Sequence, residues 1–139
     1  MKGKFITEIK LGDFAENTRT IAESDVYMFA GITGDLNPAH TNAVEAANGM
    51  FKERIAHGML SAGLISAVLG MQLPGPGTIY MGQTLKFTAP VKFGDTITAR
   101  AEVIDINLEK NRLKLRTTCM NQNNKMVLDG EALVMPPKA

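Results

Sequence analysis

The sequence is poor in the residues that mark several classes of protein. Its 139 residues include one cysteine, two histidines and no tryptophan. A lone cysteine cannot close an internal disulfide, and one cysteine with two histidines is a poor ligand set for a metal. Lys and Arg number 15 against 14 Asp and Glu, so the chain lacks the basic excess that favours nucleic acid. We therefore expect no metal and no nucleic-acid partner.

Charge is also missing from one continuous segment. The 31 residues from Ile55 to Leu85 contain no Asp, Glu, Lys or Arg. A membrane span needs about 20 predominantly apolar residues. This segment carries glycines and serines, however, and runs into Leu73-Pro74-Gly75-Pro76-Gly77, which stops a helix. A helix reaching that point from His57 would be only about 25 Å long. We therefore expect a buried element of a soluble protein and no membrane partner.

The length of the chain fits one domain, and we expect a single domain over residues 1–139. Apolar residues make up 45% of the sequence, which excludes a disordered chain. The lysines in Met1 to Phe5 are not followed by an apolar run, so no secretory signal is predicted. These features favour a cytoplasmic protein.

The first half of the chain is typical of helices and irregular segments. A helix is predicted over residues 23–32, turn structure over 35–41 and a short helix over 42–52, broken at Asn48-Gly49. Residues 58–71 are apolar on nearly every side, which predicts a helix buried on most faces. Three glycines would destabilise that helix by roughly 0.8–1 kcal/mol each. We therefore expect another backbone to approach it closely.

The second half is typical of β-strands. Alternation predicts strands over residues 79–88, from residue 97, over 113–119 and over 126–135, with turns at 109–111 and 121–125. After Val103 the alternation shifts by one residue, as a β-bulge produces. Long antiparallel hairpins and one buried helix imply an α+β domain in which a strongly curved sheet wraps the helix.

One candidate site is the segment Gly34-Asp35-Leu36-Asn37-Pro38-Ala39-His40. Gly34 lets the backbone turn, and Pro38 restricts the residue before it. A carboxylate and an imidazole held five residues apart on a stiff turn could share one water molecule. The same residue types also make ordinary turns and caps, so composition alone leaves a plain turn open.

A second candidate is Ile55-Ala56-His57-Gly58-Met59, at the start of the predicted buried helix. Free N–H groups at a helix N-terminus bind developing negative charge, and Gly58 would let a substrate oxygen approach closely. The alternative is an ordinary helix start capped by His57. Both histidines of the chain fall in these two segments. The sequence shows no P-loop, no dinucleotide-binding fingerprint and no Gly-x-Ser-x-Gly elbow.

These segments carry a resemblance to a known family. Phe29 to His40, followed by Ala46, resembles the hydratase motif of the R-specific enoyl-CoA hydratases, the MaoC-like dehydratases of the hot-dog superfamily. Ile55 to Met59 resembles the start of that family's central helix, and Phe87 to Asp95 resembles its turn between strands. The match covers nearly the whole chain. One departure is Ala39, where the family more often has Leu, Ile or Val, and this is a packing position.

The resemblance implies a hot-dog fold and reversible syn hydration of a trans-2-enoyl thioester to an (R)-3-hydroxyacyl thioester. Asp35 and His40 would hold the water and act together as general base and acid. The Gly58 N–H would stabilise the enolate-like oxygen. No separate cofactor is implied, because CoA enters as part of the substrate. The further residues expected to contact the substrate are Ser61, Asn37 and His57.

The resemblance also places the substrate and a partner. The acyl chain would lie between the helix over 59–71 and the strand with Met81 and Leu85. Relatives pair with joined sheets, which implies a homodimer. CoA phosphates need basic side chains at the mouth of the site, for which the candidates are Lys52, Arg54, Lys86 and Lys92.

Three alternatives to an acyl-CoA hydratase stay open at this point. A hot-dog thioesterase would use the same helix start with a differently placed carboxylate and would release free thiol. A non-catalytic acyl-thioester-binding module would keep the fold and lose the Asp/His pair. A dehydratase acting on 3-hydroxyacyl groups carried by acyl carrier protein would differ in its partner. The near-neutral charge favours CoA over an acidic carrier protein.

Overall fold

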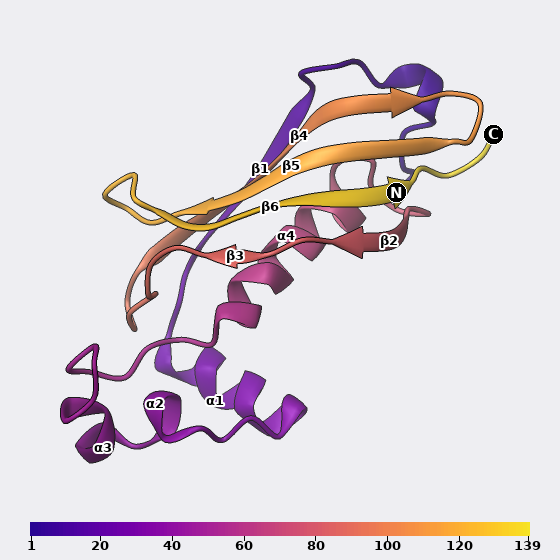
Figure 1. Ribbon diagram of the computed structural model, residues 1–139. Coiled ribbons are helices and arrows are strands. Elements are labelled where there is room, and N and C mark those ends of the chain that lie inside the picture. The colour runs from indigo at the N-terminus through magenta and orange to yellow at the C-terminus, as the bar shows by residue number, and fades with distance from the viewer.

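A curved antiparallel sheet lies against one side of a long helix in the computed structural model, which describes residues 1–139 (Figure 1). The helix is α4 (Gly58–Met71), and its bounds are those predicted. The six strands run in the order β1-β4-β5-β6-β2, and β3 also pairs with β6. The strands are β1 (Phe14–Thr20), β2 (Ile79–Gln83), β3 (Lys86–Phe87), β4 (Thr96–Asn107), β5 (Arg112–Met120) and β6 (Met126–Met135). The predicted α+β class, with a sheet wrapped around a central helix, is confirmed.

One face of α4 forms the core together with the sheet. Its residues Ile65, Val68 and Leu69 are at most 1% exposed, and Ala99 and Ala101 of β4 are fully buried opposite them. Small side chains on the strand let the helix backbone lie close to the sheet. Each large apolar side chain buried in this way stabilises the fold by roughly 1.5–3 kcal/mol. The helix therefore stays in place through packing rather than through intrinsic propensity.

The face of α4 that points away from the sheet is exposed, whereas the sequence predicted a helix buried on most faces. Gly63, Ser66 and Gly70 are exposed, and a β-carbon added at either glycine would meet no atom within 4 Å. The expectation that another backbone compensates these glycines by close approach is therefore wrong for the single chain. Met59 and Met71 are also more than half exposed, so the helix is buried on one side only.

The predicted bulge in β4 is confirmed. The pairing of β4 with β5 shifts between Val103 and Asp105, and the buried alternation that runs through Val103 ends there. The predicted strand over residues 79–88 is only partly correct, because it is divided into β2 and β3, with an irregularity between Tyr80 and Gly82. The edge strand β1 was not predicted.

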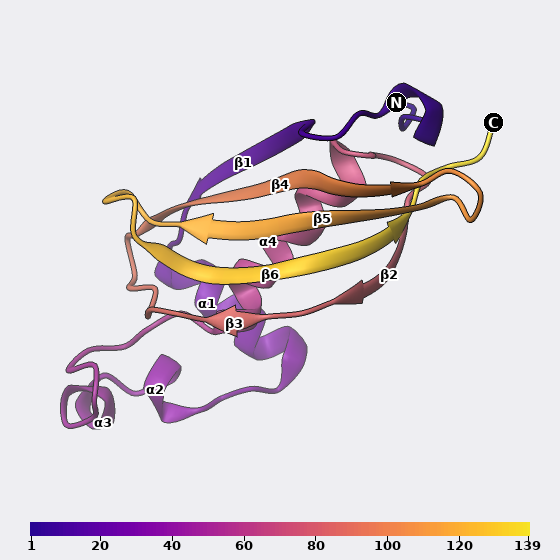
Figure 2. The same cartoon turned by 45° about the horizontal axis from the view of Figure 1, so that its top comes forward.

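The remaining helices lie beyond one end of the sheet, near the N-terminal end of α4 (Figures 1 and 2). They are α1 (Glu23–Thr33), α2 (Pro38–Thr41) and α3 (Ala43–Ala47), and a 3-10 turn, η1 (Ile6–Glu8), precedes β1. The first and third match the predicted helices, whereas α2 forms inside a segment predicted as turn. None of the helices combines the length and the apolar composition that a membrane crossing requires.

Candidate active site

Asp35 follows directly on α1. The helix ends at Gly34, which adopts a left-handed conformation with φ of 79° that favours glycine. The Asp35 N–H then donates to the Thr33 hydroxyl at 3.1 Å, and its Oδ1 accepts from the Asn37 N–H at 3.2 Å. These short-range bonds fix the carboxylate at the turn. Its side chain is 52% exposed, so it is open to a ligand.

His40 is placed by the next helix. Asn37 caps α2 by accepting the Ala39 N–H at 3.0 Å, and His40 lies in this short helix. The His40 Nδ1 bonds the Ile55 carbonyl at 2.6 Å. A carbonyl can only accept, so Nδ1 carries a proton, and in the neutral ring Nε2 keeps a free lone pair. His40 is therefore held in the tautomer whose Nε2 can take a proton.

Ile55 in turn is held from both sides. Its N–H donates to the Ala39 carbonyl at 3.1 Å, and it forms an isolated bridge with Lys92. The next residue, Ala56, donates its N–H to the Val91 carbonyl at 2.7 Å. The segment before α4 thus connects His40 to the turn that precedes β4.

The three titratable side chains of the two predicted segments meet. Possible ligand atoms of Asp35, His40 and His57 all lie within 4.8 Å of one another. Each hydrogen bond spans about 2.8 Å, so one water molecule can bridge such a gap. The rings of His40 and His57 are stacked at 3.9 Å with 30° between their planes. Lone pairs lie in the ring planes, so stacked rings do not converge on one ion. The arrangement suits a shared water better than a shared metal.

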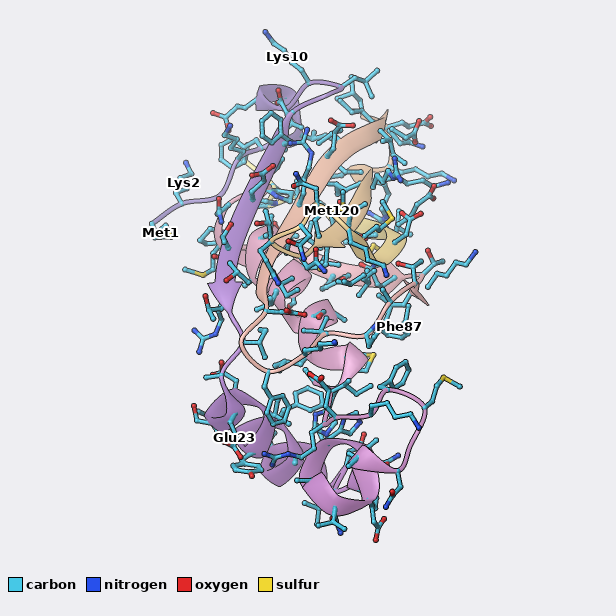
Figure 3. All side chains as sticks on the ribbon, turned by 90° about the vertical axis from the view of Figure 1, so that its left-hand side faces the viewer. Met1, Lys2, Lys10, Glu23, Phe87 and Met120 are labelled. Carbon is cyan, nitrogen blue, oxygen red and sulfur yellow. The ribbon has the colours of Figure 1, made fainter.

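Gly58 begins α4 beside this group. Its N–H has no hydrogen-bond acceptor in the chain, which leaves it free for a ligand oxygen at the positive end of a 14-residue helix. The ring of Phe87, from β3, covers its α-carbon. Figure 3 shows Phe87 between the sheet and the helices α1–α3.

His40 and Gly58 face a mostly apolar cavity of about 400 Å³. His40, Gly58, Ser61 and Phe87 line it, and Ser61 is only 3% exposed. A second groove, of about 480 Å³, lies between α4 and β2 and includes Met81, Leu85 and Ser66. This is where the acyl chain was predicted to lie. Met59 lines both spaces.

Three predicted site residues, Asp35, Asn37 and His57, do not line the cavity. Asn37 caps α2, and His57 is 2% exposed and lies behind His40. Among the basic candidates, Arg54 is occupied within the chain. It pairs with Glu23 at 2.9 Å and donates to the Tyr27 hydroxyl at 2.7 Å. Hydrogen bonds from Tyr27 and Arg54 lower the pKa of Glu23 below its ordinary value.

Sequence reasoning missed two contributions to the site. The Ile55 carbonyl orients His40, and the Phe87 ring covers Gly58. Ile55 and Phe87 both fall in segments that carried the family resemblance, but the role of each depends on a long-range contact that no local pattern reveals.

Comparisons with known proteins show what the chain and its fold are similar to. A family model described as "MaoC like domain" matches residues 7–126. An (R)-specific enoyl-CoA hydratase of Rhodospirillum rubrum is 54% identical over 133 residues, covering 96% of this chain and 92% of that protein. A 3-hydroxybutyryl-CoA dehydratase of Methylorubrum extorquens is 52% identical, covering 86% of this chain and 76% of that protein. The unliganded R-hydratase PhaJ1 of Pseudomonas aeruginosa has a TM-score of 0.93 at 51% identity, covering 99% of this chain and 88% of that chain.

Proposed function

This chain belongs to the MaoC-like domain family, and we propose that it is a hydro-lyase that reversibly hydrates trans-2-enoyl-CoA to (R)-3-hydroxyacyl-CoA. The observation that carries the proposal is the close approach of Asp35 and His40 beside the unpaired N–H of Gly58. Hydration needs a base for water, an acid for C2 and a donor for the thioester oxygen, and this group supplies all three.

Asp35 and His40 together add one water molecule to the double bond. A water molecule held between Asp35 and His40 attacks C3, its hydroxyl forms the new C–O bond, and its proton passes to the pair. The lone pair on the His40 Nε2 makes that atom the acceptor within the pair. The pair returns a proton to C2 on the same face, so the sum is addition of one water. Acid–base groups of this kind contribute typically 10²–10⁴-fold to the rate.

Gly58 stabilises the charge that develops meanwhile. The thioester oxygen becomes enolate-like as C3 is attacked, and the free Gly58 N–H donates to it. Removing a comparable donor costs about 2.7–4 kcal/mol in other enzymes. Ser61, one turn further along α4, offers its hydroxyl to the substrate inside the same cavity.

The substrate lies across both spaces. We place the thioester in the cavity at Gly58 and the acyl chain in the apolar groove between α4 and β2. Lys52 and Lys86 each adjoin a residue that lines the cavity, Phe51 or Phe87, and are the candidates for the CoA phosphates. CoA is part of the substrate, so the reaction needs no separate cofactor. We also propose a cytoplasmic location, where cysteines stay reduced, because the single cysteine of this chain is a free thiol.

A homodimer joined through β2 is also proposed. The two edges of the sheet differ: β1 ends in Asn17 to Thr20, whereas β2 exposes Ile79, Tyr80 and Met81. Beside β2 lies the open glycine face of α4. Polar edges resist pairing and apolar edges favour it. Light scattering should therefore give twice the chain mass, and Met81→Lys should shift the protein toward the monomer.

The hydratase assignment is tested with crotonyl-CoA. Loss of the enoyl absorbance without release of thiol, together with formation of (R)-3-hydroxybutyryl-CoA, is the expected result. Thiol release would identify a thioesterase instead, and the absence of both changes would identify a binding module. Crotonyl groups on acyl carrier protein, tested at the same concentration, should react more slowly than the CoA thioester; the reverse order would overturn the choice of CoA.

A further inference from the structure

His57 is the most enclosed polar residue of the site. It is 2% exposed, and its Nε2 lies 2.9 Å from the Asp35 backbone carbonyl. The carbonyl can only accept, so Nε2 carries the proton. In the neutral ring Nδ1 is then an acceptor, and this atom is buried with no partner in the chain. The neutral form of His57 is therefore held as the Nε2–H tautomer.

Three functional parts converge on this ring. Through its N–H it holds the backbone of Asp35, and through its face it stacks on His40 at 3.9 Å. It is also the residue immediately before Gly58, at the start of α4. Phe29 packs against the same ring at 4.7 Å between centroids. His57 thus ties the base, the carboxylate and the oxyanion donor together without facing the cavity.

A second proton on His57, at Nδ1, would create a buried N–H with no acceptor in the chain. It would also place positive charge against the face of the His40 ring, where the proton from water must arrive. Within the stacked pair only the His40 ring lines the cavity, so His57 does not meet the substrate.

We propose that His57 is a positioning residue for the hydration reaction, which sets the geometry of Asp35 and His40 through its Nε2–H and its stacked face. This rests on the proposed hydratase function and replaces the predicted substrate contact. A positioning role changes kcat, because misplacing reacting groups by about 1 Å can cost about 100-fold. A substrate contact would change KM instead.

The test compares three variants at residue 57. In His57→Gln the side-chain amide can reach the place of Nε2 and donate to the Asp35 carbonyl. In His57→Asn the amide reaches only the place of Nδ1, and His57→Phe keeps the stacking surface without a donor. We expect His57→Gln to retain kcat within about fivefold, while His57→Asn and His57→Phe lose about 10- to 100-fold. KM for crotonyl-CoA should stay nearly constant in all three.

Equal losses in the Gln and Asn variants, or a rise in KM at constant kcat, would overturn the proposal. Should the variants not fold, nitrogen and carbon NMR shifts of the wild-type imidazole still report the tautomer. The Nε2–H form is expected, and the Nδ1–H form contradicts the role. A wild-type protein that hydrates no enoyl-CoA refutes the proposed function, and the NMR result stays separate from that failure.

Met59 lies where the cavity and the groove meet. It is the one residue that lines both the cavity at Gly58 and the groove between α4 and β2, and its side chain is about half exposed. An acyl chain whose thioester oxygen reaches Gly58 must pass this side chain to enter the groove. Methionine is flexible and fills irregular gaps. We infer that Met59 is a specificity-determining residue that sets the acyl-chain length, given the proposed hydratase function.

Substituting Met59 tests this directly. Met59→Ala should raise kcat/KM for trans-2-octenoyl-CoA relative to crotonyl-CoA by about 10-fold, since one methylene in an apolar pocket changes discrimination by about 10- to 200-fold. The matched control is Met71→Ala, an exposed methionine on the same helix that lines neither space. An unchanged ratio, or equal losses for both substrates, overturns the inference. A wild type inactive on both substrates refutes the proposed function instead.

Discussion

The ring of Phe87 rests on the α-carbon of Gly58. A β-carbon at residue 58 would stand 2.6 Å from Cε1 and 2.7 Å from Cδ1 of that ring, closer than real contacts allow. Any larger residue at position 58 must therefore displace this ring, and residue 58 also presents the free N–H to the cavity. The requirement comes from a side chain 29 positions away in the sequence.

Gly58→Ala tests this relationship. The added methyl must displace the half-exposed Phe87 ring into the cavity, so we expect hydration of crotonyl-CoA to fall by about 10-fold or more. Overpacking of this kind costs typically 1–3 kcal/mol. Combining it with Phe87→Leu should restore part of the activity. Gly31→Ala, where an added β-carbon meets no atom within 4 Å, serves as control and should leave activity unchanged. Full activity of Gly58→Ala would disprove the contact's importance.

Asp35→Asn and His40→Gln should each lower kcat by about 10²–10⁴-fold. Both replacements are close in size to the native side chains, and Asn at residue 35 keeps an oxygen that can accept the Asn37 N–H. Thermal unfolding should therefore move little. Asp105→Asn, at an exposed position of β4, is the matched control. Near-native turnover of either site variant would show that the assignment of this pair is mistaken.

The Cys119 thiol should not react in the folded protein. Burial raises its pKa from an ordinary value of 9.0 to about 12, so the thiolate is scarce at neutral pH. The unfolded chain ionises first as pH rises, which lowers the free energy of unfolding by about 1.4 kcal/mol per pH unit between about 9 and 12. Cys119→Ala should remove this alkaline slope. The measurements are thiol titration with and without denaturant, and urea unfolding across this pH range. Rapid labelling of the native thiol would contradict the burial.

Asp25 should stabilise the start of α1 at neutral pH. A hydrogen bond from Arg19 at 2.6 Å, and another from the Ala22 N–H at 2.9 Å, hold the pKa of Asp25 below its ordinary value. The stabilisation is present above the unfolded value of about 3.9 and is lost as pH falls through the folded value. Asp25→Asn should therefore reduce the unfolding free energy by about 1–3 kcal/mol at pH 7.

The difference in unfolding free energy between wild type and Asp25→Asn should shrink as the pH falls below about 4, because the wild-type carboxylate then becomes protonated and uncharged. Glu109→Gln, an exposed residue in the turn after β4, is the control for a lost surface charge. A difference between wild type and Asp25→Asn that does not depend on pH would show that the ion pair contributes nothing.

Periodicity predicted those elements whose faces are buried. The bounds of α4 and the shift after Val103 followed from apolar spacing, because the core imposes its period on the sequence. The strand β1 was not predicted, because it has no buried face to impose such a period. It is an edge strand, and its residues Phe14–Thr20 include no buried side chain, so its pairing with β4 leaves little hydrophobic pattern.

The candidate site likewise combines features that local sequence predicts with contacts between distant segments. Asp35 and His40 lie on one short turn whose residue types restrict the backbone, so local sequence suggested that they act together. The orientation of His40 by Ile55 and the covering of Gly58 by Phe87 join distant segments and could not be predicted locally. The inward place of His57 depended on the same tertiary packing.

The segment at Ile55 and Ala56 is the part of the site that we expect to open first on warming. Three hydrogen bonds connect it to Ala39, His40 and Val91, whereas the sheet is held by continuous ladders. A segment with so few bonds can open locally at a lower free energy than the sheet. Such an opening releases His40 and exposes the buried Ala56 while the ladders of the sheet stay paired. Activity should therefore be lost on warming before the sheet melts, and the Ala56 amide should exchange its hydrogen earlier than amides of β5.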